Sequence, residues 1–415
     1  MTPGEPFLLG VNYWPRRKAM GWWAAFDPIE VREEFAVIRS LGLRCVRFFL
    51  LWESFQPSPD RVSTTALDHL RAVCDTAADL GLVVQPTFFT GHMSGPNWAP
   101  GWLVDASRVP DAAGRQVVGL DRPGGYPHPV VDVYETPLVV EAEDRLIEAV
   151  CGAIRDHPAL WGWSLGNEPD LFCRPRDAAT GRRWVRDRVA AIRAADPAHP
   201  VLVGLHTASL EADVGFRVDD VAAETDVSVM HGYSIYSSIA RAPLDPDYVP
   251  FTAALTAALA GRPVLYEEFG VNTGSPDGPS RWEEHPGWDG RKLRIHFASE
   301  DDAAAYYAAV LPRLVDAGAL GAFAWCFADY EPGLWDRPPC DHQPHERFFG
   351  LVRPDGTIKP SAIALRDFAA GDPVIREPAR TVSLHGGPDA YYRDPAATMR
   401  DLYATWVRSG ASTSA

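Results

Sequence analysis

Two short stretches of the sequence end in side chains that could carry acid–base or nucleophilic chemistry. Asn167 and Glu168 follow the apolar stretch GWSLG at residues 162–166, and Glu267 and Glu268 lie near the end of PVLYEEF at residues 263–269. Where two carboxyl groups are buried close together, one stays protonated near neutral pH while the other stays charged. Whether Glu168 and one of the two later glutamates form such a pair depends on the elements that carry them.

Short apolar stretches alternate along the chain with longer segments of helical periodicity. Strands are expected over residues 7–14, 45–52, 83–89, 162–166, 201–205, 227–233, 263–269 and 321–327. Helices are expected over residues 28–43, 65–82, 139–157, 181–196, 247–261, 299–318 and 359–371. This alternation predicts an α/β protein with a parallel sheet covered by helices, and eight such units in a row match the closed (β/α)₈ TIM barrel. An open doubly wound sheet would need a glycine-rich phosphate loop, and the first strand continues into GVNYWPRRK instead.

The same pattern predicts how the chain divides. Residues 1–370 are expected to form one catalytic barrel, and residues 371–415 a C-terminal extension packed on the barrel, with one helix and a frayed tail. Three long connections, at residues 89–138, 271–300 and 328–358, follow the third, seventh and eighth strands. Because the C-terminal ends of barrel strands carry the active site, these connections should surround it.

Composition excludes several partners. The formal net charge of −16 argues against nucleic-acid binding, because the protein repels phosphate backbones. No stretch has the length of a membrane span, and no basic segment followed by an apolar core opens the sequence, so we expect a cytoplasmic protein with no membrane partner. Six cysteines lack CxxC spacing and are expected as reduced thiols.

In a barrel, the fourth and seventh strands lie across the mouth from each other. Glu168 and a glutamate of the seventh strand can therefore converge on one bond held between them. Glycoside hydrolysis needs this arrangement: one carboxylic acid protonates the leaving oxygen, and an ionised carboxylate attacks or stabilises the anomeric carbon. We expect neither a cofactor nor a metal ion for this chemistry.

Several motifs make the chain similar to the clan A glycoside hydrolases, most of all family 5. These are Asn167-Glu168-Pro169 on the fourth strand and Glu268-Phe269-Gly270 on the seventh, together with Arg47, His231-x-Tyr233, Trp325 and His92 near strands two, six, eight and three. The resemblance implies Glu168 as acid/base, Glu268 as nucleophile and Asn167 as the residue that binds the sugar 2-hydroxyl. It further implies that Arg47 and Tyr233 hydrogen-bond the nucleophile, that Trp325 forms the base of the sugar subsite, and that His92 and His231 border it.

Other side chains are expected at the sugar on weaker grounds. Tryptophans beside glycine, proline or charged residues, Trp14 and Trp335 among them, form flat apolar surfaces on which sugar rings stack. The stretch with Cys340, His342 and His345 lacks the fourth ligand of a closed zinc site, and we expect it to border the pocket.

The resemblance is greatest with the β-mannosidase and β-mannanase part of the family. It predicts a retaining β-glycosidase that acts from the chain end on β-mannosides or short β-manno-oligosaccharides, since three long connections can close a groove into a pocket. The alternatives are a β-glucosidase or exo-glucanase of the same fold, a carbohydrate-binding protein without activity, and a metal-dependent barrel isomerase. The last would use Glu168, Glu268, His92 and His231 as ligands.

The two adjacent glutamates are expected to differ. Strand alternation sends neighbouring side chains to opposite faces, so only one of Glu267 and Glu268 should point at the sugar. Family register selects Glu268, and Glu267 is expected to face the helical shell or a neighbouring basic group.

Overall fold

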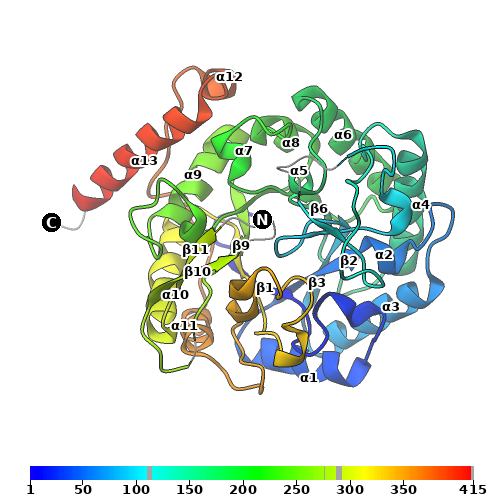
Figure 1. Cartoon of the computed structure of the whole chain (residues 1–415). Helices are drawn as coiled ribbons and strands as arrows, with labels where there is room; N and C mark the ends of the chain where they lie inside the picture. The colour runs from blue at the N-terminus through cyan, green and yellow to red at the C-terminus, as the bar shows by residue number, and fades with distance from the viewer. Residues whose placement is uncertain (110–114, 275, 287–291, 413–415) are drawn as a thin grey trace.

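A computed structural model of the chain describes all residues except 110–114, 275, 287–291 and 413–415. Eight parallel strands form one sheet, in the order β7-β6-β3-β2-β1-β12-β9-β8. The two end strands approach each other through a bridge between His206 and His231, and the His231 N–H donates to the Leu205 carbonyl at 2.7 Å. The sheet is thereby nearly closed into a barrel, and helices surround it (Figure 1). The predicted (β/α)₈ fold is confirmed.

The eight barrel strands coincide with the eight predicted stretches within a few residues. They are β1 (Leu8–Tyr13), β2 (Cys45–Leu51), β3 (Val83–Thr90), β6 (Trp163–Asn167), β7 (Val201–Gly204), β8 (Ser228–His231), β9 (Val264–Phe269) and β12 (Gly321–Ala324). Six of these strands are buried at every position, and the other two at every position after the first. Burial on both faces is why they appear in the sequence as continuous apolar runs.

The outer helices follow their strands. They are α1 (Pro28–Ser40), α3 (Thr64–Asp79), α4 (Pro137–Ile154), α6 (Ala178–Ala195), α8 (Val218–Glu224), α9 (Tyr248–Ala260), α10 (Glu300–Asp316) and α11 (Pro360–Ala369). Local signals fix several starts: the Ser299 hydroxyl accepts from the Asp302 N–H at 3.1 Å, and acidic residues fill the first turn of α10. Helix α8 was not predicted, because its seven residues are too few for an apolar period to stand out.

The long connections carry structure of their own. The connection after β3 contains β4 (Asn97–Trp98), η2 (Gly101–Leu103) and β5 (Val117–Val118), and the one after β9 contains the hairpin β10 (Arg281–Pro286) and β11 (Lys292–Phe297). After β12 come two short 3₁₀ helices, η4 (Pro332–Leu334) and η5 (Pro344–Phe348). Short helices α2 (Trp52–Phe55), α5 (Pro169–Phe172) and α7 (Ala208–Glu211) follow three other strands directly.

The C-terminal extension lies against one side of the barrel (Figure 1). It forms α12 (Gly387–Tyr391) and α13 (Pro395–Ser412) rather than one helix. The Tyr392 hydroxyl donates to the Ser209 carbonyl at 2.9 Å, and the Tyr403 hydroxyl donates to Asp245 at 2.5 Å. These bonds tie the extension to the α7 and α9 region, while the last residues of the predicted tail, 413–415, lie outside the described residues.

All six cysteines are free thiols, and five of them are buried. Among the described residues, no helix combines the length and the apolar character that crossing a bilayer requires.

Candidate active site

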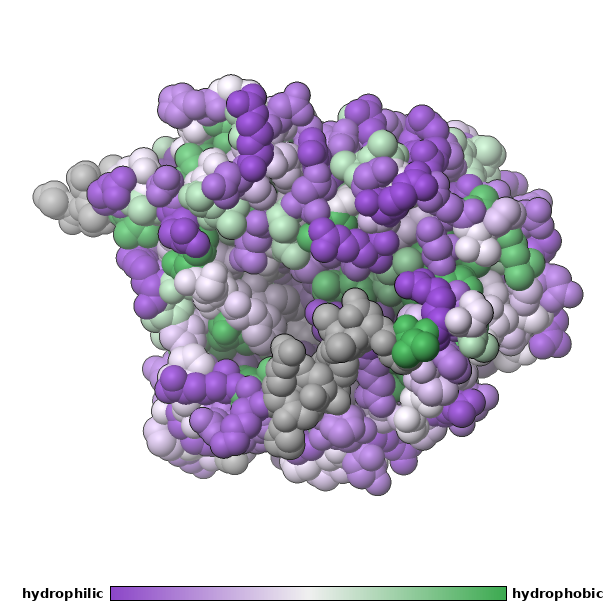
Figure 2. Space-filling view, turned by 45° about the horizontal axis from the view of Figure 1, so that its top comes forward, coloured by the Kyte–Doolittle hydropathy of each residue, from purple (hydrophilic) through white to green (hydrophobic). Residues whose placement is uncertain are grey.

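A pocket of about 500 Å³ opens at the C-terminal ends of the barrel strands. The loops after β3, β7, β8, β9 and β12 contribute to its rim, and the surface is hollowed between largely hydrophilic side chains (Figure 2). Seven of the ten predicted site residues line it: His92, Asn167, Glu168, His231, Tyr233, Glu268 and Trp325. The volume is in the range of sites for small ligands.

The backbone at the end of β6 turns Glu168 toward the pocket. Gly166 has φ +90°, which favours glycine, and Glu168 itself adopts the left-handed conformation with φ 47° and ψ 58°. The Glu168 N–H donates to the Gly204 carbonyl of β7 at 2.9 Å, so the neighbouring strand holds this turn. A non-glycine residue in this conformation is typical of functional sites whose surroundings fix the backbone.

Both glutamates of β9 point into the barrel, which corrects the expectation from strand alternation. In the pairing with β8, Met230 opposes Tyr266 and His231 opposes Glu268, so β9 carries one extra residue. The pairing with β12 shifts at the same place. This bulge re-aims the side chains: Glu267 is fully buried beneath the pocket, and Glu268 lies 5% exposed at its surface.

Glu267 belongs to a network of buried polar side chains inside the barrel, formed by Asn12, Arg47, Gln85, His231 and Glu267. One Glu267 oxygen accepts from Gln85 and lies 3.5 Å from Arg47 Nε, and the other lies 2.9 Å from His231 Nε2. Glu267 was expected to face either the helical shell or a neighbouring basic group. It faces the basic group Arg47 and not the helical shell. Burial raises the pKa of Glu267, but Arg47 and His231 more than offset this and hold it below its usual value.

Arg47 links the buried network to the carboxylate above it. Its Nη1 donates to Asn12 at 2.8 Å and to Glu268 Oε2 at 3.0 Å, and its Nη2 donates to Asn167 at 2.8 Å. Its Nε donates to Thr87 at 3.1 Å. The guanidinium has zero exposure, so it positions Glu268 and Asn167 from below rather than lining the pocket.

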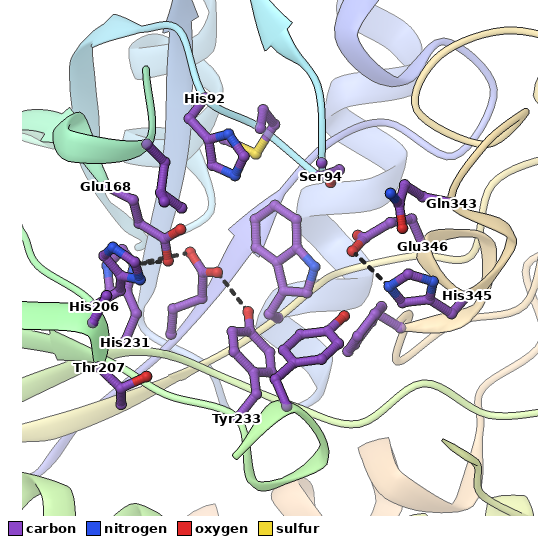
Figure 3. A pocket seen from close by; sticks show the side chains of 18 of the residues that line it. His92, Ser94, Glu168, His206, Thr207, His231, Tyr233, Gln343, His345 and Glu346 are labelled. Atoms are coloured by element: carbon purple, nitrogen blue, oxygen red, sulfur yellow. Dashed lines mark hydrogen bonds and ion pairs between the residues drawn. The ribbon is translucent and has the colours of Figure 1, made fainter. Parts of the chain in front are cut away.

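Glu268 is held at both oxygens. Tyr233 donates its hydroxyl to Oε1 at 2.5 Å (Figure 3), and Arg47 donates to Oε2. Glu168 and Glu268 converge, because these two carboxylates and His231 each offer an atom within 4.8 Å of the others. Carboxyl groups about 5 Å apart leave room for a sugar carbon but not for an intervening water.

His231 bridges the two levels. Its Nδ1 lies 3.0 Å from Glu168 Oε1, and its Nε2 contacts Glu267. Burial alone would lower the pKa of His231, but the surrounding carboxylates, Glu268 foremost, raise it to about 9. One proton is therefore held between His231 and Glu168, and it resides on the imidazole.

The two pocket carboxyls are shifted in opposite directions. Burial raises the pKa of Glu168, but the charges of His206 and His231 outweigh burial and bring the pKa below its usual value. The pKa of Glu268 is raised, because burial and the nearby Glu168 charge together exceed the opposing effects of His231 and Arg47.

His92 and Asn167, both predicted to bind the sugar, line the pocket. The His92 Nδ1 lies 3.0 Å from Asn97 Oδ1, and the Asn97 amide donates to two carbonyls, so Nδ1 carries the proton and Nε2 is free to accept. Burial lowers the pKa of His92 to about 3, so the ring is neutral. Asn167 donates to the His92 carbonyl at 3.1 Å.

The tryptophans differ from expectation. Trp325 lines the pocket, but Trp14 is fully buried against Phe49 with ring centroids 5.0 Å apart. Trp335 packs outside the pocket lining, beneath the Arg347 guanidinium. A flat side chain beside a proline or a charge indicates a loop, but it does not indicate which side of the loop faces the substrate.

Several pocket residues were not predicted. His206 pairs with Asp170 at 3.0 Å. Burial alone would lower the pKa of His206, but the charges of Asp170 and Glu168 outweigh burial and raise it to about 9. Ser94, Arg115, Gln343 and Glu346 also line the pocket, as does His345 of the stretch expected at its border. Within that stretch, Cys340 and His342 do not line this pocket. Isolated polar residues in loops belong to no periodic pattern, which is why the sequence did not reveal them.

A metal ion is the other ligand that Glu168, His231 and Glu268 could hold. Both ring nitrogens of His231 already face carboxylates, and the Arg47 cation already contacts Glu268. A divalent ion would have to displace these contacts, so the donor set fits acid–base chemistry better than metal binding.

No protein-family model matches the sequence. Over 163 residues the chain is 27% identical to mannan endo-1,4-β-mannosidase F of Aspergillus clavatus, covering 36% of this chain and 37% of that protein. Among solved structures, an exo-β-1,4-mannosidase from Opitutaceae bacterium strain TAV5 matches with a TM-score of 0.71 at 26% identity, covering 88% of this chain and 59% of that one. GH5_18 from Streptomyces cattleya, in complex with GlcNAc, matches with a TM-score of 0.71 at 22% identity, covering 96% of this chain and 93% of that one.

The chain thus spans less than two thirds of the length of the first two relatives. The third, at its lower identity, is evidence for the fold. Together they confirm the predicted resemblance to family 5 glycoside hydrolases and the barrel architecture.

Proposed function

We propose that this chain is a retaining β-glycoside hydrolase that removes mannose from the ends of β-mannosides or short β-manno-oligosaccharides. The observation that carries the proposal is the approach of Glu168 and Glu268 at the pocket surface, within 4.8 Å between carboxylate atoms. Retaining glycosidases hold their carboxyl groups about 5–5.5 Å apart, whereas inverting enzymes need about 6.5–9.5 Å to admit a water.

In the first step, Glu268 attacks the anomeric carbon of the bound sugar. The proton held between His231 and Glu168 passes through Glu168 to the glycosidic oxygen, and the bond from the anomeric carbon to that oxygen breaks. The leaving group departs as an alcohol, and the sugar is esterified to Glu268. Arg47 and Tyr233 hydrogen-bond the attacking carboxylate and orient it.

In the second step, water enters where the alcohol left. Glu168, now a carboxylate, takes one proton from this water as its oxygen attacks the anomeric carbon, and the ester bond to Glu268 breaks. The proton returns to the Glu168–His231 pair. Two displacements restore the original configuration, so the product is β-mannose.

Mannose is the favoured sugar because the mannan endo-1,4-β-mannosidase and exo-β-1,4-mannosidase named above are the relatives with the higher identities. Action at chain ends is favoured by the enclosing loops. Gln343, His345 and Glu346 stand on one side of the pocket, and Leu293 to Ile295 of the β10–β11 hairpin contribute to its rim.

Labelling with 2-deoxy-2-fluoro-β-D-mannosyl fluoride tests mechanism, sugar and nucleophile together. The fluorine slows both steps, so the ester accumulates on the attacking residue. We expect a single added mass, found on the peptide that contains Glu268. Labelling of another residue, or turnover of 4-nitrophenyl β-mannoside to α-mannose seen by NMR, would overturn the proposal.

A panel of 4-nitrophenyl β-glycosides separates the alternatives. A higher kcat/KM for the glucoside than for the mannoside would assign the chain to the β-glucosidases. Isomerisation of free mannose that is lost on dialysis against EDTA, with no glycoside hydrolysed, would support the isomerase alternative. Binding of mannosides without turnover would support a carbohydrate-binding protein.

A further inference from the structure

Four polar side chains form a cluster on one side of the pocket, which we call the end wall: Ser94, Gln343, His345 and Glu346. Ser94 comes from the loop after β3, and the other three come from the loop after β12. Figure 3 shows the end wall opposite Glu168, His206 and His231, with the space of the pocket between them. Nothing in the mechanism above uses these four residues.

The end wall is buried but incompletely hydrogen-bonded. Glu346 and Ser94 are each 9% exposed and His345 is 4% exposed. Among the described residues, His345 Nδ1 has no hydrogen-bond partner, whereas Ser94 hydrogen-bonds the Glu346 carboxyl. A buried polar atom without a protein partner is rare, so the end wall has hydrogen-bonding capacity that its own side chains leave unused.

The Glu346 carboxyl is prepared to accept hydrogen bonds from neutral donors. Among the described residues its ion-pair partner is His345, whose Nε2 lies 3.5 Å from Oε1. Burial lowers the pKa of His345 to about 3, so that ring carries no charge at neutral pH. Burial, with a contribution from the charge of Glu268, raises the pKa of Glu346 to about 7, while hydrogen bonds from Ser94 and Trp325 oppose the rise. None of these neighbours is a cation, so the carboxyl can still accept a hydrogen bond from a hydroxyl group of a ligand.

Sugar geometry says which hydroxyl this is. When the anomeric carbon lies between Glu168 and Glu268, carbon 4 lies on the opposite side of the six-membered ring. The end wall also lies across the pocket from Glu168, the residue that faces the leaving group, which places Glu346 on the side of the glycone.

We infer that Glu346, with Ser94 beside it, binds the 4-hydroxyl of the terminal mannose and thereby ends the pocket there. In a 1,4-linked chain, oxygen 4 of every internal sugar carries the preceding sugar, so only a terminal residue can present a free hydroxyl to Glu346. The inference rests on the proposed function, and it makes Glu346 the residue that selects chain ends.

The test is a cycle of two enzymes and two substrates. Wild type and Glu346→Ala are compared on 4-nitrophenyl β-D-mannoside and on its 4-deoxy analogue. A hydrogen bond from a hydroxyl to a charged group corresponds to roughly a 10- to 100-fold effect on kcat/KM. Wild type should therefore lose about that factor on the 4-deoxy substrate. Glu346→Ala should lose it on the mannoside and lose little further on the 4-deoxy substrate.

Two further variants test whether the effect is specific to the contact with the 4-hydroxyl. Ser94→Ala should show the same coupling at a smaller size. Glu331→Gln removes a surface carboxyl, 39% exposed, that pairs with Arg17 outside the pocket, and it should resemble wild type on both substrates. If Glu346→Ala lowers kcat/KM by the same factor on both substrates, its role is structural and the inference fails.

The two proposals fail separately. If wild type hydrolyses neither substrate, the proposed function is wrong. If wild type hydrolyses the mannoside and the 4-deoxy analogue equally well, the β-mannosidase activity stands and the role of Glu346 is refuted.

Discussion

The buried network and the end wall are two polar clusters that border the same pocket and are built in opposite ways. The buried network comes from barrel strands, and Asn12, Arg47, His231 and Glu267 in it have zero exposure. Every nitrogen of Arg47 has an acceptor within the protein. The end wall comes from two loops, and the ion-pair contact that its carboxyl makes among the described residues is with His345, whose pKa is lowered to about 3.

This difference separates preparing the reaction from recognising the substrate. A network whose charged side chains are already paired fixes charges and orientations before the sugar arrives, which is what electrostatic stabilisation of a transition state requires. A carboxyl that faces no cation can gain a hydroxyl partner when a ligand binds. Substitutions in the buried network should therefore change kcat and stability, whereas substitutions in the end wall should change the choice of substrate.

Glu268→Gln should have the largest effect. It keeps the shape of the side chain but removes the attacking carboxylate, and loss of a nucleophile typically costs on the order of 10⁴-fold or more in kcat. Steady-state hydrolysis of 4-nitrophenyl β-mannoside measures this loss. Activity within tenfold of wild type would mean that another residue attacks the sugar.

Glu168→Ala should have the next largest effect, and its size should depend on the leaving group. General acid catalysis contributes roughly 10²–10⁴-fold, but a 2,4-dinitrophenolate departs without a proton. The loss in kcat/KM should therefore be large for methyl or mannosyl leaving groups and small for 2,4-dinitrophenyl β-mannoside. Equal losses on all leaving groups would contradict the acid role of Glu168.

The barrel strands, Glu168 and the Glu267–Glu268 pair could be located from local sequence, whereas family resemblance selected Glu268 of the two. Eight apolar runs fix the strands, and a strand that ends in an abrupt polar pair marks the C-terminal face of a barrel. Arg47 was found through family resemblance, since a basic residue within an apolar run shows no partner by itself. Its partners on β1, β3, β6 and β9 are brought together only by closure of the sheet.

The rest could not be predicted for identifiable physical reasons. The inward side chain of Glu267 follows from a bulge, and a bulge arises from how β9 pairs with β8 and β12, not from the sequence of β9. Glu346 depends on the path of a long loop with little regular structure. Trp14 was expected at the sugar from its neighbours in sequence, yet it packs against Phe49 inside the core.

Glu267→Gln and Glu268→Gln should change stability in opposite directions. The pKa of Glu267 is lowered in the folded state, so its charge stabilises the fold above pH 4.5, and this contribution is lost as the pH falls through the folded pKa. Removing one partner of a buried charge pair costs about 3–5 kcal/mol. The pKa of Glu268 is raised, so its charge costs stability at neutral pH, and an uncharged glutamine relieves that cost.

Urea unfolding at pH 7 measures both changes in the free energy of unfolding. Glu267→Gln should be less stable than wild type, and Glu268→Gln should be as stable or more stable. Labelling by the fluorosugar should survive in Glu267→Gln, because the attacking carboxylate is intact. If Glu267→Gln and Glu268→Gln lose equal stability, the buried network and the pocket surface do not differ in the way that we propose.

Tyr233→Phe should have the smallest effect and should move one side of the pH profile only. Wild-type kcat/KM should rise on the acidic side as Glu268 ionises, above pH 4.5 because its pKa is raised, and should fall near pH 9 as His231 loses the shared proton. Without the Tyr233 hydroxyl, the charged form of Glu268 loses a hydrogen bond, so the acidic side should move to higher pH while the alkaline side stays. The loss at the optimum should be roughly 10- to 100-fold, as for one hydrogen bond to a charged group. A shift of the alkaline side instead would assign the tyrosine to the Glu168–His231 pair and contradict its role as a support of the nucleophile.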